Sequence, residues 1–151
     1  MVCGMSSSNA FKPPSKNGVG PSTVGIPANT SLSAIEFLAS KFKAISFEEW
    51  AQRFQDGDIL NAEGRVMTPQ DSLLHETHIH YYRSVRDEPK LPFKAHIIYQ
   101  DAHLLVADKP HFMPVTPSGR YVQQSLLVQL KQQFNLPDLS PLHRIDRETA
   151  G

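Results

Sequence analysis

The residues best suited to chemistry in this sequence lie close to its C-terminal end. Asp146 is flanked by Arg144 and Arg147, and small residues follow from Thr149 to Gly151. Small residues let the backbone turn tightly beside a ligand. Neighbouring positive charge favours an ionised carboxylate, and guanidinium groups grip phosphates through paired hydrogen bonds. This pattern suits an enzyme that acts on a nucleic-acid base, although the same residue types also form surface ion-pair networks without catalytic function.

The stretch around Asp146 resembles a known motif. Residues 143–151 have the sequence HRIDRETAG. This is similar to the pattern His-Arg-Leu-Asp-x-x-Thr-Ser-Gly of the RluA-type family of RNA pseudouridine synthases. Two positions depart from that pattern, because Ile145 replaces Leu and Ala150 replaces Ser.

A second stretch resembles the other opening motif of the same family. Residues 97–110 have the sequence IIYQDAHLLVADKP, and residues 113–115 continue the match. In the family this motif is a strand, an acidic turn and a second strand that leads into Lys-Pro. His111 and Phe112 stand where the family usually has a small residue and Gly. The resemblance covers about the last third of the chain closely and the middle third loosely.

The resemblance implies a reaction and a role for each motif residue. The family breaks the bond from ribose to uracil nitrogen and rejoins ribose to carbon 5, without redox change and therefore without a redox cofactor. Asp146 would act as a nucleophile or as a base that removes a sugar proton. The expected substrate-binding residues are Arg144, Arg147, His143, Thr149 and Lys109. Arg144 would hold a phosphate or fill the space left by the flipped base, His143 would orient the strand, and Thr149 would brace the turn. Lys109 would supply a positive charge near the substrate unless it pairs with Asp108.

Composition limits the class of protein. The 151 residues could hold one ordinary domain or two very small ones, and 40% hydrophobic with 20% charged residues is typical of a globular protein with a disordered portion. No apolar run approaches the ~20 residues of a membrane span. There is no secretory signal pattern, and the single cysteine, Cys3, predicts a reducing cytoplasm. We expect structured ribosomal or transfer RNA as partner, no membrane and no obligate protein partner.

The charge balance predicts modest electrostatic binding to RNA. The net charge is zero, with fifteen basic and fifteen acidic residues. Residues 1–30 carry two basic and no acidic residues, residues 31–94 carry eight basic and ten acidic, and residues 95–151 carry five of each. Phosphate-driven affinity should therefore be modest and salt-dependent.

The first part of the chain predicts a disordered leader and a small α+β domain. Residues 1–30 are rich in Gly, Pro and Ser and cannot bury enough surface to order. Capping boxes at Ser33 and Ser46 precede two apolar helical stripes, and strands are expected at 59–60, 65–67 and 78–84. This order resembles the alpha-L RNA-binding motif of the family and makes residues 31–86 one domain. The candidate RNA contacts are Lys41, Lys43, Arg53 and Arg65, with solvated surface charges as the alternative. The Trp50 stripe is predicted to be core.

Three histidines in this domain raise the question of a metal site. His78 and His80 would share a strand face, and His75 could approach from the preceding turn. No cysteine or well-placed carboxylate completes a ligand set, so we expect no metal.

The second part predicts the start of a mixed-sheet catalytic domain. Residues 87–94 are expected to be a linker and residues 95–151 the catalytic part, with strands at 96–99, 104–108 and 141–145 and a helix at 121–134. Family members continue well past the Asp146 motif, so we expect an N-terminal part that is nearly inactive alone. A non-catalytic RNA-binding module, or a fragment without stable tertiary structure, are the alternatives.

Overall fold

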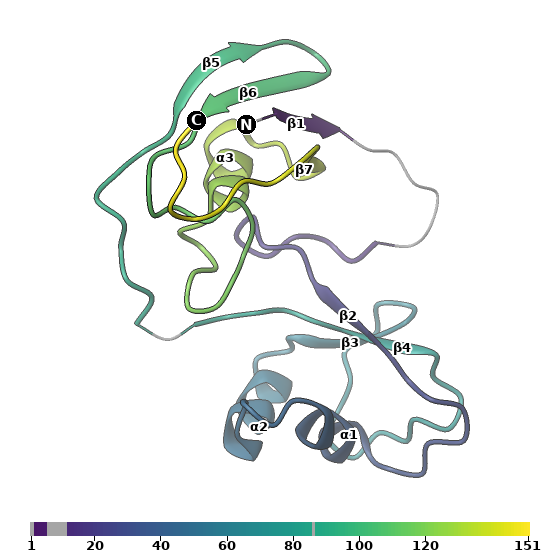
Figure 1. Ribbon diagram of the computed structural model, residues 1–151. Coiled ribbons are helices and arrows are strands. Elements are labelled where there is room, and N and C mark those ends of the chain that lie inside the picture. Colours follow the sequence, from purple (N-terminus) through teal and green to yellow (C-terminus); the bar gives the residue numbers. More distant parts are fainter. Residues whose placement is uncertain (1, 6–11, 86) are drawn as a thin grey trace. The chain divides into compact units, whose positions relative to one another are not determined.

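The computed structural model describes residues 2–5, 12–85 and 87–151, and this part of the chain divides into two compact units (Figure 1). One unit contains Pro21–Tyr82. The other contains Pro14–Gly20, Arg83–Gly151 and the strand Val2–Met5. These boundaries differ from the expected 31–86 and 95–151, because residues on both sides of each expected boundary pack into the units. Both units are mixed α and β.

The Pro21–Tyr82 unit packs two helices on a three-stranded antiparallel sheet (Figure 1). Its elements are β2 (Ser22–Gly25), α1 (Ala34–Lys41), α2 (Phe47–Gln55), β3 (Ile59–Asn61) and β4 (His78–Tyr81), and β4 is the central strand. The Glu36 carboxylate accepts hydrogen bonds from the backbone and hydroxyl of Ser33 before α1. The Ser46 hydroxyl accepts one from the Glu49 amide in α2. The two predicted helices are therefore confirmed, together with a fully buried Trp50.

Three details of this unit differ from the sequence-based expectations. Strand β2 lies in the stretch expected to be disordered, where its pairing with β4 supplies the order that its composition does not. The expected strand at 65–67 pairs with β3 only through an isolated bridge between Leu60 and Val66, although the Met67 amide donates to the Ile59 carbonyl. Phe47 is 52% exposed, although its spacing placed it on the apolar face of α2.

The histidines of β4 form a small polar cluster. The rings of His78 and His80 are edge to face with centroids 4.7 Å apart, and the Nδ1 atom of His80 lies 2.9 Å from the Thr23 hydroxyl. Burial lowers the pKa of His80, and the nearby His78 lowers it further. Within the described ranges, no three potential ligands come together as a metal site.

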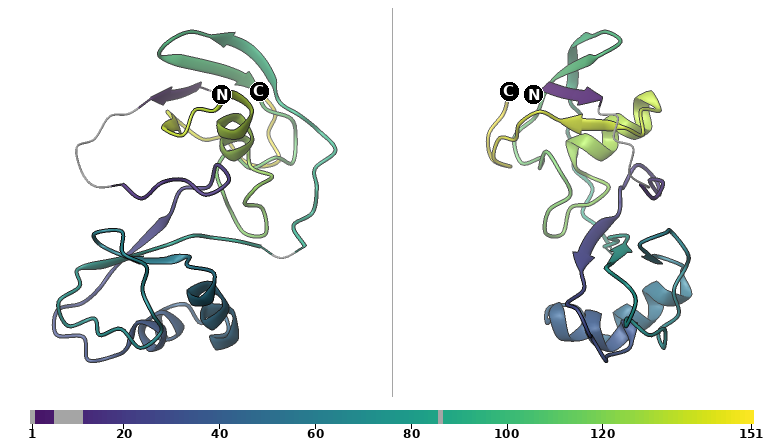
Figure 2. Two further views of the ribbon diagram at one scale, coloured as in Figure 1. Left: turned by 180° about the vertical axis from the view of Figure 1, so that it is seen from behind. Right: turned by 90° about the vertical axis from the view of Figure 1, so that its right-hand side faces the viewer.

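The other unit packs one helix on a four-stranded antiparallel sheet in the order β5-β6-β1-β7 (Figure 2). Its elements are β1 (Val2–Met5), β5 (His96–Gln100), β6 (Leu104–Asp108), α3 (Leu126–Phe134) and β7 (Leu139–Pro141). Every pairing among these strands is antiparallel, so the expected mixed sheet is not found in the described residues. Strand β1 comes from the expected leader, and its Cys3 is 1% exposed. Desolvation there raises the pKa of the Cys3 thiol.

The approach to Asp146 is irregular rather than extended. Strand β7 ends at Pro141, so the strand expected at 141–145 was wrong. Proline lacks the N–H group that would continue the ladder. Beyond it, Ile145 packs partly buried against the core of the unit, and this contact fixes the start of the turn that carries Asp146.

Residues expected to form a free linker are attached to this unit. The Glu88 carboxylate accepts hydrogen bonds of 2.6, 2.9 and 2.7 Å from the amides of Val122, Gln123 and Gln124. The Leu91 amide donates to the Gln124 side chain. These contacts hold residues 88–91 against the segment that leads into α3.

No helix in the described ranges combines the length and apolar character that a bilayer crossing requires.

Candidate active site

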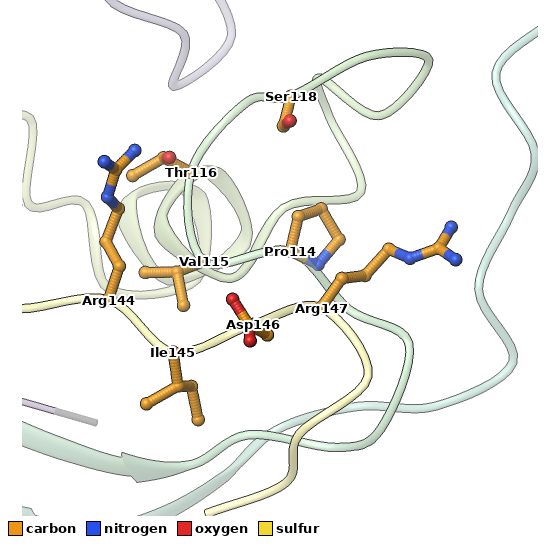
Figure 3. A pocket seen from close by; sticks show the side chains of 8 residues that line it. All are labelled: Pro114, Val115, Thr116, Ser118, Arg144, Ile145, Asp146 and Arg147. Carbon is orange, nitrogen blue, oxygen red and sulfur yellow. The ribbon is translucent and has the colours of Figure 1, made fainter.

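The Asp146 side chain lies in an open depression of about 480 Å³. The lining residues are Pro114, Val115, Thr116, Ser118, Arg144, Ile145, Asp146 and Arg147. Figure 3 shows the carboxylate pointing toward the loop that carries Pro114 and Val115, while the two arginine side chains extend away from it and diverge from each other. Asp146 is exposed and can therefore be reached from solvent.

The two arginines do not pair with the carboxylate they flank in sequence. Arg147 binds Glu148 instead, with Nη2 2.8 Å and Nε 2.9 Å from Oε1, and its guanidinium lies 5.7 Å from the centre of the Tyr121 ring. Across the described residues, neither Arg144 nor Arg147 forms an ion pair with Asp146. Arg144 is exposed, so its charge is available to a ligand.

Lys109 does not face the depression, although the sequence suggested a substrate-side charge. Its side chain is fully buried, and its ammonium group donates to the carbonyls of Pro110 at 3.0 Å, Met113 at 2.8 Å and Arg147 at 3.3 Å. Desolvation lowers the pKa of Lys109. The lysine thus ties the Lys-Pro loop to the residue that follows Asp146.

Further contacts fix the segment after Asp146 against the same loop. The backbones of Lys109 and Gly151 exchange two hydrogen bonds, of 3.1 and 3.0 Å. His111 donates from Nδ1 to the Glu148 carbonyl at 2.7 Å. The Thr149 amide donates to the Asp146 carbonyl at 3.1 Å, which closes the turn. Thr149 therefore braces the turn through its backbone, whereas the exposed His143 has no described contact that orients Asp146.

The other wall of the depression is the loop that follows Lys-Pro, and hydrogen bonds to α3 hold this loop in place. The carbonyls of Pro114 and Val115 each accept a 2.9 Å hydrogen bond, from the amides of Leu126 and Leu127 at the start of α3. Met113 and Val115 bury their side chains in the core. Thr116 and Ser118 from this loop line the depression, and neither was singled out from the sequence. Their only sequence signal was their position in the loop that follows Lys-Pro.

The RNA contacts expected in the Pro21–Tyr82 unit have different surroundings. Lys41 and Lys43 are exposed. Arg65 is exposed but lies 3.3 Å from Asp71. Arg53 is only 8% exposed, and its guanidinium lies 4.9 Å from the Trp50 ring. Arg53 therefore belongs to the core of the unit rather than to an accessible binding surface.

Several relatives of this chain among known proteins are RNA pseudouridine synthases. An uncharacterised RNA pseudouridine synthase of Synechocystis is 31% identical over 117 residues, which are 78% of this chain and 40% of the relative. RNA pseudouridine synthase 5 of rice is 28% identical over 139 residues, covering 82% of this chain and 35% of the relative. The mitochondrial tRNA pseudouridine(32) synthase of Saccharomyces cerevisiae is 26% identical over 122 residues, covering 78% and 25%.

The chain spans well under half the length of these relatives. No family model matches the sequence.

Proposed function

The chain belongs to the RluA-type family of RNA pseudouridine synthases, and we propose that the protein converts a uridine of RNA to pseudouridine with Asp146 at the reacting centre. The observation that carries this proposal is the place of Asp146. It is exposed in a depression, on a turn that hydrogen bonds from Lys109, His111 and Thr149 hold. A burial of this carboxylate in the core would have excluded the reaction.

The proposed reaction is an isomerisation without redox change, so it calls for no redox cofactor. The bond from ribose C1′ to uracil N1 breaks, a bond from C1′ to C5 forms, and the proton leaves C5 while N1 gains one. Asp146 serves as a nucleophile or as a base that removes a sugar proton, and both roles require an accessible carboxylate. The target uridine has to leave its stack to reach the depression, at a cost of a few kcal/mol.

The surrounding cations fit roles in RNA binding. Arg144 is exposed beside Asp146 and is suited to a phosphate or to the space left by the extruded base. In the Pro21–Tyr82 unit, two helices and a small sheet fit an alpha-L-like RNA-binding module, with Lys41 and Lys43 as its accessible contacts. We further propose structured ribosomal or transfer RNA as substrate. The single cysteine favours a reducing compartment such as the cytoplasm.

The test measures pseudouridine formed on unmodified tRNA and rRNA transcripts by the protein expressed from its complete reading frame. Asp146→Asn removes the anionic oxygen with little change in shape, and we expect kcat to fall by at least about 10²-fold. Asp138→Asn is the matched control, because Asp138 is exposed in a turn of the same unit and does not line the depression. An Asp146→Asn variant as active as Asp138→Asn would overturn the proposal.

A further inference from the structure

The loop opposite Asp146 is held in place along almost its whole length. The Met113 carbonyl accepts from Lys109 Nζ, and the next two carbonyls accept from the start of α3. The Pro117 carbonyl accepts from Arg83 Nη1 at 3.1 Å. The backbones of Ser118 and Tyr121 exchange hydrogen bonds of 2.8 and 3.0 Å around a tight turn. The backbone of this loop is therefore held in place, which limits where its side chains can lie before a ligand arrives.

Two hydroxyl groups on this rigid loop face the depression. Thr116 is half-buried and Ser118 is exposed, and both line the space beside Asp146 (Figure 3). Neither hydroxyl has a hydrogen-bond partner among the residues that the structure describes, and the same is true of the Arg144 guanidinium. A hydroxyl that accepts and donates, near a cation that only donates, matches a sugar–phosphate group. The neighbouring walls are the apolar side chains of Pro114, Val115 and Ile145.

The reaction itself limits which part of the nucleotide such fixed groups can hold. The uracil detaches and rejoins through a different ring atom, so its edges move relative to the ribose. A fixed contact to a base edge would have to break during the reaction. The ribose and its phosphate keep their place, so contacts to them persist from substrate to product.

We propose that Thr116 and Ser118 bind the sugar–phosphate of the target nucleotide and hold it over Asp146. This inference rests on the proposed function, because it takes uridine in RNA as the ligand. Because the loop is already ordered, the contacts add affinity without an ordering cost. They act equally in ground state and transition state, so their loss should appear in Kd and KM rather than in kcat.

The experiment measures the Kd of the complete-reading-frame protein for unmodified tRNA and rRNA transcripts in an Asp146→Asn background, where no turnover complicates binding. We expect Thr116→Val and Ser118→Ala each to raise Kd about 3- to 20-fold. Thr116→Ser keeps a hydroxyl and should restore most of the affinity. Ser84→Ala removes an exposed hydroxyl of the same unit away from the depression and should leave Kd unchanged.

The same substitutions with Asp146 intact should raise KM and leave kcat within about twofold. Unchanged Kd in Thr116→Val and Ser118→Ala would overturn this inference while the proposed function stands. An active Asp146→Asn protein, or a wild-type protein that modifies none of the transcripts, would instead overturn the proposed function. A fall in kcat without a change in KM would also contradict the assigned contacts.

Discussion

Phe112 adopts a backbone conformation that bulky residues rarely take. Its φ is +65°, and its side chain is 52% exposed. The family pattern usually has Gly at this position, and glycine reaches positive φ without strain. The left-handed region costs a bulky residue about 1–2 kcal/mol. The turn after Lys-Pro is therefore kept despite an unfavourable residue, because the contacts of Lys109 and His111 fix it on both sides.

Phe112→Gly should therefore stabilise the protein. Glycine makes the unfolded chain more flexible, which lowers the free energy of unfolding by about 0.4–1 kcal/mol. The relief of strain is larger than this loss, so we expect the free energy of unfolding to rise by about 0.5–1 kcal/mol. Urea unfolding measures this difference. Phe93→Gly removes a similarly exposed ring without positive φ and should not stabilise. Equal destabilisation by both substitutions would show that the strain at Phe112 is absent.

Lys109→Met tests whether the buried lysine supports the Asp146 turn. Methionine fills a similar volume but leaves the carbonyls of Pro110, Met113 and Arg147 without their donor. An unsatisfied buried polar group costs about 1–3 kcal/mol, so we expect the free energy of unfolding to fall by about that amount. Lys90→Met, at an exposed position, is the matched control in the same unfolding measurement. A Lys109→Met protein as stable as the control would contradict the structural role.

At the scale of elements, α3 depends on a carboxylate from a distant segment. The amides that precede the helix cannot find partners within it, and Glu88 accepts from three of them. The carbonyls of Pro114 and Val115 accept from the amides of Leu126 and Leu127, the first two residues of the helix. The start of α3 therefore joins residue 88 to the loop that lines the depression.

Glu88→Gln should loosen this junction. The side-chain amide of glutamine has one carbonyl oxygen that can accept hydrogen bonds, but it lacks the negative charge and the second acceptor oxygen of glutamate. Hydrogen bonds to charged groups are worth about 1.5–3 kcal/mol, and we expect a loss of stability in that range. Thermal unfolding, with the exposed Asp87→Asn as control, measures it. Hydrogen exchange should also accelerate at the amides of 122–124, and unchanged exchange would contradict the expected anchoring role.

Elements with local signals were predictable, and elements that depend on distant partners were not. The helices α1 and α2 follow from apolar spacing and capping residues, and β5 and β6 follow from two apolar runs around Asp101. Strands β1 and β2 have four residues each, and their order comes from pairing with strands far along the chain. The catalytic role of Asp146 is predicted from its motif and stays a prediction. The burial of Lys109 and Arg53 could not be predicted. Nothing in the sequence shows that backbone carbonyls would accept hydrogen bonds from the Lys109 ammonium group, or that the Arg53 guanidinium would lie against the Trp50 ring.

At the scale of the whole molecule, charge limits how the protein could hold the RNA that we propose as its substrate. Fifteen basic and fifteen acidic residues leave no net attraction to phosphate. Of the candidate cations, Arg53 and Lys109 are buried, while Arg65 and Arg147 already lie against acidic side chains. Arg144, Lys41 and Lys43 remain exposed. Affinity should therefore depend on shape and hydrogen bonds more than on counterion release.

The salt dependence of RNA binding tests this distribution directly. Each neutralised phosphate adds about −0.7 to −0.9 to the slope of log K against log salt concentration, so two to four contacts predict a slope between about −1 and −4. Fluorescence anisotropy of the full chain with a labelled stem–loop RNA at several KCl concentrations measures it.

Lys41→Gln with Lys43→Gln should make the slope shallower by about 1 to 2 if the Pro21–Tyr82 unit binds RNA. Lys90→Gln with Lys94→Gln changes the same charge at exposed positions outside that unit and should leave the slope unchanged. A slope steeper than about −6, or equal effects of the two pairs, would show that RNA contacts an extended basic surface that these cations do not define.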